Sequence, residues 1–189
     1  IIYTAATSVH DLLDNLLTWA SVQMRSTELR TSPIELRALI DASFYPLKAM
    51  ASDKGVDVVN AVESLGADCD ESMIRIVVRN LISNGIKFTP KGGTVTVSAA
   101  EVRIGSAQSA VEVTVRDNGV GMDQDTLSEL FSFSRKVSRS GTQGERGTGL
   151  GLFLCRDIIE RHGGTFKVES RPGLGTAFHF TLPCQEARP

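Results

Sequence analysis

Apolar residues recur at helical spacing in several parts of the chain. Residues 8–23 have the pattern of an amphipathic helix, with polar side chains mostly on the opposite side. The polar stretch RSTELRTSP follows, which its composition marks as a linker, and Pro33 suits the first turn of a second helix. A third helical pattern runs over 70–88, where Asp70 is placed to cap the helix and TPKGG stops it.

Short runs rich in valine and threonine predict β-strands between and after these helices. Two shorter helical patterns and a long polar, glycine-bearing loop separate the later strands. Helices and strands fall into groups and most strands are joined by hairpins, so we expect an α+β fold, a two-layer sandwich with helices on one face of a mixed sheet. The expected strands cover 56–62, 94–100, 110–117, 165–170 and 176–183, the helices 123–131 and 150–161, and the loop 132–149.

The helix over 70–88 carries two asparagines four residues apart, although asparagine is a poor residue for a helix interior. Residues i, i+4 and i+7 share a helix face, so Asn80, Asn84 and Lys87 are expected to project together. Amide oxygens suit Mg²⁺, and a lysine one turn further adds a positive charge for phosphates. The alternative is a pair of capping or solvent-facing amides.

A second motif, RDNGVGMD, ends one of the predicted strands. A carboxylate at Asp117 can accept a hydrogen bond from an exocyclic amine such as adenine N6, while Gly119 and Gly121 let a ring approach the backbone. Asp-Asn-Gly is also an ordinary turn signal. Because glycines stand where a calcium loop needs oxygen side chains, an EF-hand is excluded.

A third motif, GERGTGLGLFL, places glycines directly before an amphipathic helix. Free backbone N–H groups at such a helix start can hold an anion, whereas a flexible hinge is the alternative. The spacing fits neither the Rossmann fingerprint nor the P-loop.

Composition narrows the possible partners and compartment. The 189 residues are 41% hydrophobic, enough for one sizeable core, and the net charge of -2 offers no general attraction to nucleic acid or an anionic membrane. Three widely spaced cysteines support neither a disulfide framework nor a zinc site and fit a reducing cytoplasm. The chain has no apolar run of membrane-spanning length and begins without Met, which indicates a piece of a longer protein.

Taken together, RNLISNGIKFTPKGG, DNGVG, LFSFS, GTGLGL and the closing GGTFKVESRPGLGTAFHFTLP resemble the N, G1, F and G2 boxes of a sensor histidine kinase's ATP-binding domain. The resemblance implies the two-layer ATP-binding fold shared with gyrase, heat-shock chaperone and mismatch-repair ATPases. It also implies a domain over 31–189, preceded by the end of a dimerisation hairpin and a linker over 1–30.

The resemblance assigns roles to the N box. Asn84 would ligate Mg²⁺, Asn80 would support the metal and the phosphates, and Lys87 would contact phosphate. Phe88 would pack near the adenine. Gly85 stands where the family usually has alanine, which loosens the helix by about 1 kcal/mol.

The other motifs would complete an ATP site. Asp117 would bind adenine N6, Gly119 and Gly121 would floor that pocket, and Thr176 would lie beside it. The loop 132–146 would be the ATP lid, and Phe131 and Phe133 would anchor the base of this lid. The residues that would hold the phosphates are Gly147, Thr148, Gly149, Leu150 and Gly151. The lid side chains that could neutralise charge during transfer or contact ATP are Lys136, Arg139, Arg146 and Thr142. For each of these four, the alternative is a loop residue that is simply solvated.

Asn80 also bears on the type of reaction. In the hydrolytic branches of the superfamily the same helix resembles E-x-x-x-N, and the glutamate is the base for the attacking water. This chain has Asn80 at the position of that glutamate, and an amide cannot take a proton at neutral pH. The pattern therefore favours transfer of the γ-phosphate to an acceptor. An ATPase clamp and a non-catalytic nucleotide sensor remain as alternatives.

The resemblance further implies an acceptor histidine on a dimerisation helix, a response regulator and a homodimer. His10 in VHDLL has the look of an acceptor, but too few residues follow it for the return helix of a hairpin. We expect the acceptor histidine upstream of this chain. The chain itself would bind ATP in the cytoplasm and would have no direct contact with the membrane. His162 is expected at a helix C-terminus and His179 on a surface-facing strand position.

Overall fold

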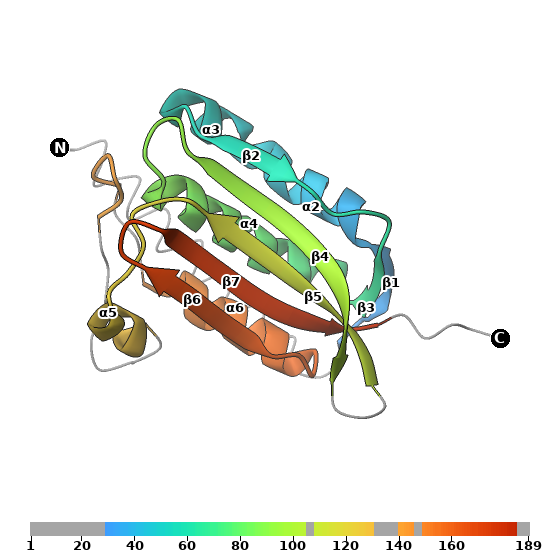
Figure 1. The fold of residues 1–189 in the computed structure, drawn as a ribbon. Coiled ribbons are helices and arrows are strands. Elements are labelled where there is room, and N and C mark those ends of the chain that lie inside the picture. The colour runs from blue at the N-terminus through green and yellow to red at the C-terminus, as the bar shows by residue number, and fades with distance from the viewer. Residues whose placement is uncertain (1–28, 105–107, 131–139, 146–148, 185–189) are drawn as a thin grey trace.

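A mixed five-stranded sheet with helices packed on one face forms the body of the computed structural model, which describes residues 29–104, 108–130, 140–145 and 149–184 (Figure 1). The strand order is β2-β4-β5-β7-β6, and β1 pairs with β3 in a separate two-stranded sheet. In chain order the elements are β1 (Ser32–Glu35), α2 (Leu36–Phe44), the 3₁₀ turn η1 (Tyr45–Leu47), α3 (Lys48–Lys54), β2 (Asp57–Asn60), β3 (Gly66–Cys69), α4 (Glu71–Phe88), β4 (Thr94–Ile104), β5 (Gln108–Asp117), α5 (Gln124–Glu129), α6 (Gly151–Arg161), β6 (Phe166–Arg171) and β7 (Gly175–Pro183).

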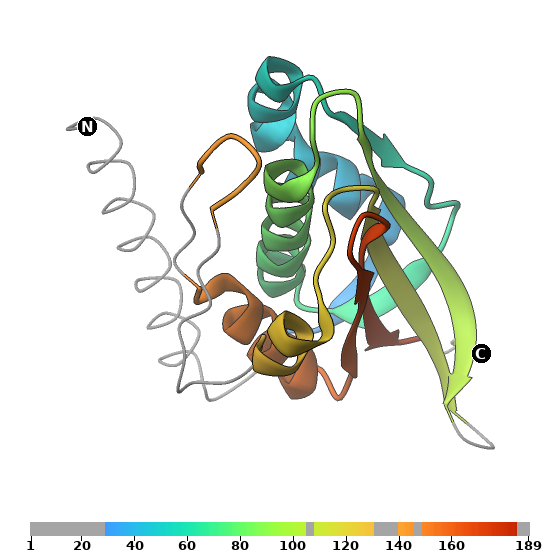
Figure 2. The ribbon, with the colours of Figure 1, turned by 60° about the vertical axis from the view of Figure 1, so that its left-hand side comes forward.

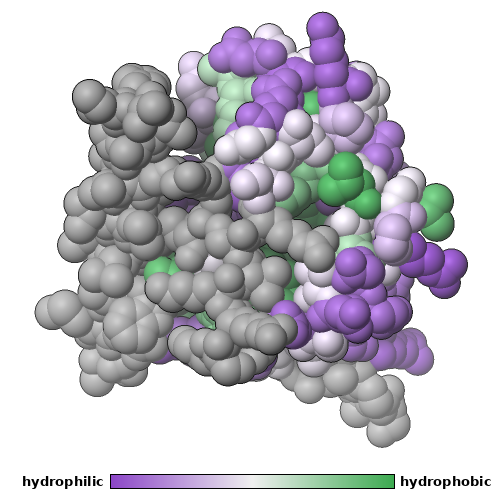
Figure 3. Space-filling view, turned by 90° about the vertical axis from the view of Figure 1, so that its left-hand side faces the viewer, coloured by the Kyte–Doolittle hydropathy of each residue, from purple (hydrophilic) through white to green (hydrophobic). Residues whose placement is uncertain are grey.

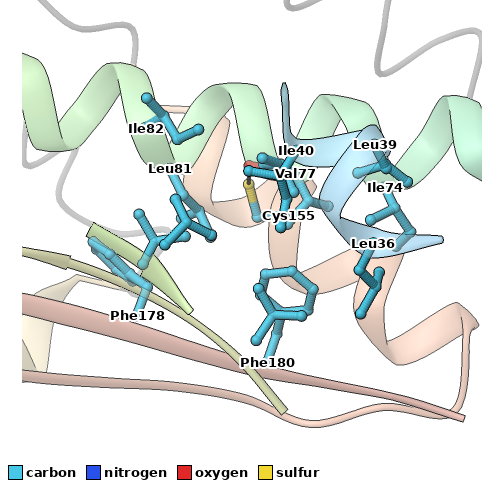
Figure 4. Close-up of a cluster of buried hydrophobic side chains, with 14 of the residues drawn as sticks. Leu36, Leu39, Ile40, Ile74, Val77, Leu81, Ile82, Cys155, Phe178 and Phe180 are labelled. Carbon is cyan, nitrogen blue, oxygen red and sulfur yellow. Dashed lines mark hydrogen bonds between the residues drawn. The ribbon is translucent and has the colours of Figure 1, made fainter. Parts of the chain in front are cut away.

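The core lies between the sheet and the helices α2, α4 and α6. Alternation along the strands points one row of side chains at the helices, so Val95 and Val97 of β4 and Phe180 of β7 are fully buried. Figure 4 shows Phe178 and Phe180 of β7 beneath the apolar face of α4, together with side chains of α2 and with Cys155. The predicted α+β two-layer sandwich is confirmed.

Most of the predicted elements are present, and the hairpin of β4 and β5 is longer than its sequence pattern indicated. The connection from β2 to β4 is not a hairpin, because these two strands pair in parallel. A parallel pair needs a crossover, and α4 lies within it. The helix with the two asparagines is therefore held against the middle of the sheet.

Two expectations near the start of this region were wrong. Pro33 lies in β1, paired with Asp68 of β3, and the helix begins only at Leu36, where Glu35 accepts hydrogen bonds from the first amides of α2. Proline fits here because a short edge strand tolerates a residue without an N–H. No strand is expected over 66–69, where the structure has β3, since four residues with one aspartate carry little periodic signal.

The histidine positions agree with expectation in part. His162 caps the C-terminal end of α6 but is buried, at 6% exposure. His179 lies on the sheet face away from the helices, half-buried beside Thr114. His10 and the rest of 1–28 lie outside the described residues. In the described part of the chain, the helices are too short or too polar to cross a bilayer.

Candidate functional site

The helix α4 presents a row of polar side chains opposite its core face. Asp70 caps it by accepting the Met73 N–H at 3.1 Å, and the buried apolar residues fix which side faces the sheet. Asn80, Asn84 and Lys87 are half-buried along the other side, as the spacing predicted. Two amides and a cation therefore project from one helix face.

Asp117 ends β5 and is 6% exposed. The hydrogen bonds that described residues donate to its carboxylate both reach Oδ1, from the Gly119 N–H at 2.8 Å and the Thr176 N–H at 3.2 Å. Thr176 is its strand neighbour on β7, as expected for a residue beside the same pocket. Burial raises the pKa of the Asp117 carboxyl, and these hydrogen bonds and the charge of Arg116 oppose that rise.

The glycines after Asp117 lie where side chains would not fit. A Cβ added at Gly119 would stand 2.3 Å from the Phe88 carbonyl oxygen, and one at Gly121 would stand 1.9 Å from the Arg171 carbonyl oxygen. Gly121 also has φ +66, a conformation that L-residues rarely adopt. The loop therefore closes onto the end of α4 and onto the β6–β7 turn because both positions lack side chains.

The third motif meets α4 about two turns further from its end, at Asn80. A Cβ built on Gly151 would lie 3.1 Å from Asn80 Oδ1, so the start of α6 adjoins the first asparagine. Gly149 has φ +72, and the N-cap residue Leu150 has no side-chain oxygen to accept the amides of the first turn. Backbone N–H groups at a helix start are the kind of donor that binds an anion.

The segment 140–145 docks on the last carbonyls of α4. The Thr142 N–H donates to the Lys87 carbonyl at 3.1 Å, and the Thr142 hydroxyl donates to the Thr89 carbonyl at 3.2 Å. Carbonyls at a helix C-terminus have no partner within the helix, so they serve as the attachment. Thr142, predicted as a lid candidate, is brought to the site by these bonds.

Lys87 lies in a partly buried environment at this end of the helix. Its Nζ stands 4.7 Å from the centre of the Phe88 ring, a cation–π distance. Burial lowers the pKa of Lys87, the charge of Glu145 raises it, and the charge of Lys54 lowers it. The lysine expected to meet phosphate therefore sits among charges from two other segments.

One helix thus gathers motifs that are far apart in the sequence: 119–120, 141–142 and 151 all contact α4. Figure 2 shows α4 upright between the sheet and the segment 140–145, with the start of α6 beside it. The described surface at this end of the molecule is mainly hydrophilic, with a few separate hydrophobic side chains (Figure 3). The predicted residues that fall outside the described ranges are Phe131, Phe133, Lys136, Arg139, Arg146, Gly147 and Thr148.

Comparison with known proteins agrees with this geometry. The family model of histidine kinase-, DNA gyrase B- and HSP90-like ATPases matches residues 69–186, which include α4 and every motif described above. The chain belongs to this ATPase family. The prediction drawn from the motifs is confirmed.

Histidine kinases are among the proteins of this ATPase family that the chain resembles. The histidine protein kinase DivJ of Caulobacter vibrioides is 32% identical over 97% of this chain. The solved mycobacterial sensor histidine kinase MprB is 26% identical with a TM-score of 0.67, covering 82% of this chain and 98% of that one. Full-length ShkA, solved in complex with AMPPNP, is 25% identical with a TM-score of 0.74, covering 94% of this chain and 36% of that one. The chain spans 30% of the length of DivJ.

Some residues of this ATPase domain were missed in the sequence. Ser170 of β6 accepts the Met122 N–H at 2.8 Å and lies 3.0 Å from the Thr176 hydroxyl, so it ties the loop after Asp117 to β7. Asn118 belongs to the turn signal after β5, and in the structure its Oδ1 also accepts the Thr94 N–H at 2.8 Å. A serine within a regular alternating strand carries no local signal of such a role.

Proposed function

We propose that this chain binds Mg-ATP and transfers the γ-phosphoryl group to a histidine on a dimerisation helix, as the catalytic part of a sensor histidine kinase. The observation that carries the proposal is the gathering of three distant motifs on the polar face and C-terminal end of α4. Membership in the ATPase family and similarity to histidine kinases support it.

In this proposal Asp117 recognises the adenine. Its Oδ1 is held by two backbone amides, so Oδ2 would accept the N6 amine, with Gly119 and Gly121 below the ring. Thr176 adjoins the carboxylate on the neighbouring strand, and Phe88 would pack near the ring edge. Backbone bonds that fix a buried carboxylate in advance reduce the cost of ordering it on binding.

The phosphates and metal would lie along α4. Among the described residues no group of three His, Cys, Asp or Glu side chains could hold a metal, so the donors on offer are the amide oxygens of Asn84 and Asn80. Mg²⁺ fits such a set because it prefers oxygen, keeps several waters and binds through nucleotide phosphates. It would neutralise phosphate charge there. The phosphates would contact Lys87 and the backbone amides of the glycine-rich segment, which are those of Gly147, Thr148, Gly149, Leu150 and Gly151.

Transfer to an acceptor is favoured over hydrolysis because Asn80 cannot act as a base for water. In the transfer, the bond from the γ-phosphorus to the β–γ bridging oxygen breaks and a phosphorus–nitrogen bond to the acceptor imidazole forms. ADP leaves with the electron pair of the broken bond. The protein mainly positions the group and offsets charge, with Arg146 and Thr142 as the lid residues nearest that task.

The remaining features of the parent protein follow from the same proposal. Residues 1–30 would be the end of the dimerisation hairpin and a linker, and 31–189 the ATP-binding domain. The full-length protein would form a homodimer, work in the cytoplasm and signal to a response regulator.

Calorimetric titration of ATP, with and without Mg²⁺, tests this function on the wild type and on Asp117→Asn. We expect Mg-dependent binding that weakens at least tenfold in Asp117→Asn, because the amide places a donor where N6 donates. Asp57→Asn, the same change at an exposed position of β2, should bind like the wild type.

The same samples are then assayed for free phosphate and for transfer to an added acceptor helix. Negligible phosphate release with transfer to the acceptor supports the kinase. Steady phosphate release without acceptor would assign the chain to the hydrolytic branch instead. Absence of ATP binding by the wild type would overturn the proposal and leave an interaction module with the fold alone.

A further inference from the structure

Lys54 is a lysine that none of the sequence motifs includes, yet it is only 4% exposed. It is the last residue of α3, and Gly55, with φ +67, turns the chain away directly after it. Its Nζ donates to the Lys87 carbonyl oxygen and to Glu145 Oε1, each at 2.5 Å. Burying an ammonium group is costly without such partners, so this position is built for a charged pair.

The Glu145 carboxylate is held from two sides. Oε1 accepts from Lys54, and Oε2 accepts the Gln143 N–H at 2.8 Å. The turn around it closes through the Gly141 N–H, which donates to the Glu145 carbonyl at 2.8 Å. Burial alone would raise the pKa of the Glu145 carboxyl, but the hydrogen bonds from Lys54 and Gln143 and the charge of Lys54 lower it.

This turn rests directly on Lys87. A Cβ added at Gly141 would stand 2.6 Å from Lys87 Cγ, so the two segments touch without space between them. The Glu145 charge also acts on Lys87, whose pKa it raises against the lowering by burial. A single carboxylate thus pairs with the buried Lys54 and also acts through its charge on Lys87, the lysine expected at the nucleotide phosphates.

We propose that Lys54 is a positioning residue of the nucleotide site, which holds the Glu145 carboxylate and so keeps it from pairing with Lys87 in competition with the phosphates. The inference rests on the proposed binding of ATP. It assigns Lys54 no contact with the nucleotide, because its Nζ is directed to the Lys87 carbonyl and to Glu145.

The proposal predicts a particular pattern of variants. Lys54→Met keeps a long apolar stem in the buried position and leaves the Glu145 charge to Lys87. Glu145→Gln removes the competing charge, while an amide oxygen can still accept from Lys54. The double variant therefore lacks both the Lys54 ammonium group and the Glu145 charge that competes with the phosphates for Lys87. It should bind ATP more tightly than Lys54→Met alone.

Calorimetry of the whole chain with ATP and with adenosine separates phosphate contacts from adenine contacts. For Lys54→Met we expect ATP affinity to fall about tenfold, because the side chain of Glu145 is 35% exposed and water screens part of its charge. Adenosine affinity should stay within about twofold of the wild type, which also shows that the variant folds. Glu145→Gln alone should bind ATP at least as tightly as the wild type.

Suppression of the ATP defect with adenosine affinity unchanged throughout is the decisive result, since a lysine that only stabilised the fold would affect both ligands alike. The Lys54→Met/Glu145→Gln variant should return to within about threefold of wild-type ATP affinity. Lys48→Met removes an exposed lysine of the same helix and should change neither ligand's affinity.

The proposal is overturned if Lys54→Met binds ATP normally, if it loses adenosine and ATP equally, or if the double variant is as weak as or weaker than Lys54→Met. These outcomes require a wild type that binds ATP. A wild type that binds neither ligand would overturn the proposed function, and this inference with it.

Discussion

Gly85 lies in the last turn of α4, between Asn84 and Lys87, and Gly85→Ala sets two physical effects against each other. In a helix interior alanine is favoured over glycine by about 1 kcal/mol, because glycine loses more backbone freedom on folding. The helix face at Gly85 is buried against β4, however. A Cβ added there would stand 2.9 Å and 3.0 Å from the two methyl carbons of Val95.

The contact with Val95 decides the sign of the change. Val95 is fully buried and β-branched, so its side chain has little freedom to rotate away. Overpacking a close-packed core costs about 1–3 kcal/mol. Subtracting the gain in helix propensity leaves a net destabilisation of about 1 kcal/mol for Gly85→Ala.

Urea unfolding of the wild type, Gly85→Ala, Val95→Ala and the double variant measures this balance. If the overlap is real, Val95→Ala costs about 1–2 kcal/mol less in the Gly85→Ala background than in the wild type, because it then also relieves the clash. A Gly85→Ala variant that is about 1 kcal/mol more stable, with no coupling to Val95, would refute the reasoning. It would show that α4 moves away from the sheet at little cost.

Three further predictions concern the loop, the helix caps and the buried carboxylate. Gly121→Ala should destabilise the chain by about 3 kcal/mol or more in urea unfolding, whereas Gly173→Ala, with φ +74 but nothing within 4 Å, should cost about 1 kcal/mol. His162→Leu should cost about 2 kcal/mol, because His162 Nε2 accepts the buried Asp70 N–H at 3.0 Å, and hydrogen exchange at that amide should speed up. Burial raises the pKa of the Asp117 carboxyl, so the stability that this group contributes is present below its unfolded pKa of about 3.9 and is lost as the pH rises through the folded pKa. At pH 7 ligand-free Asp117→Asn should therefore unfold at a higher temperature than the wild type, and this difference should shrink towards pH 4.

Each of these has a result that would contradict it. Equal losses of unfolding free energy in Gly121→Ala and Gly173→Ala would mean that the Arg171 carbonyl moves away from the added Cβ at little cost. Unchanged stability and exchange in His162→Leu would mean that water replaces the ring. A lower unfolding temperature for Asp117→Asn at pH 7 would show that the two backbone hydrogen bonds outweigh the burial of the charge.

The sequence by itself determined the fold class and which polar residues share one face of α4. The periodicity of α4 places Asn80 and Asn84 away from the apolar face, and valine alternation predicts the strands that bury it. Asp117 is identified by the end of a strand followed by glycines. These features depend on local spacing, which residue order alone specifies.

Tertiary structure decided what lies against the end of α4. Lys54 reaches Lys87 through a bond to a main-chain carbonyl, and Thr142 uses the same acceptor. Every residue has a carbonyl, so such a bond leaves no mark in the pattern of side chains. β1 and β3 escaped prediction for a related reason, since four-residue strands acquire their conformation by pairing with each other. Lys54 pairs with Glu145, 91 positions apart, because α3 and the segment 140–145 both lie against the end of α4, where each bonds to the Lys87 carbonyl.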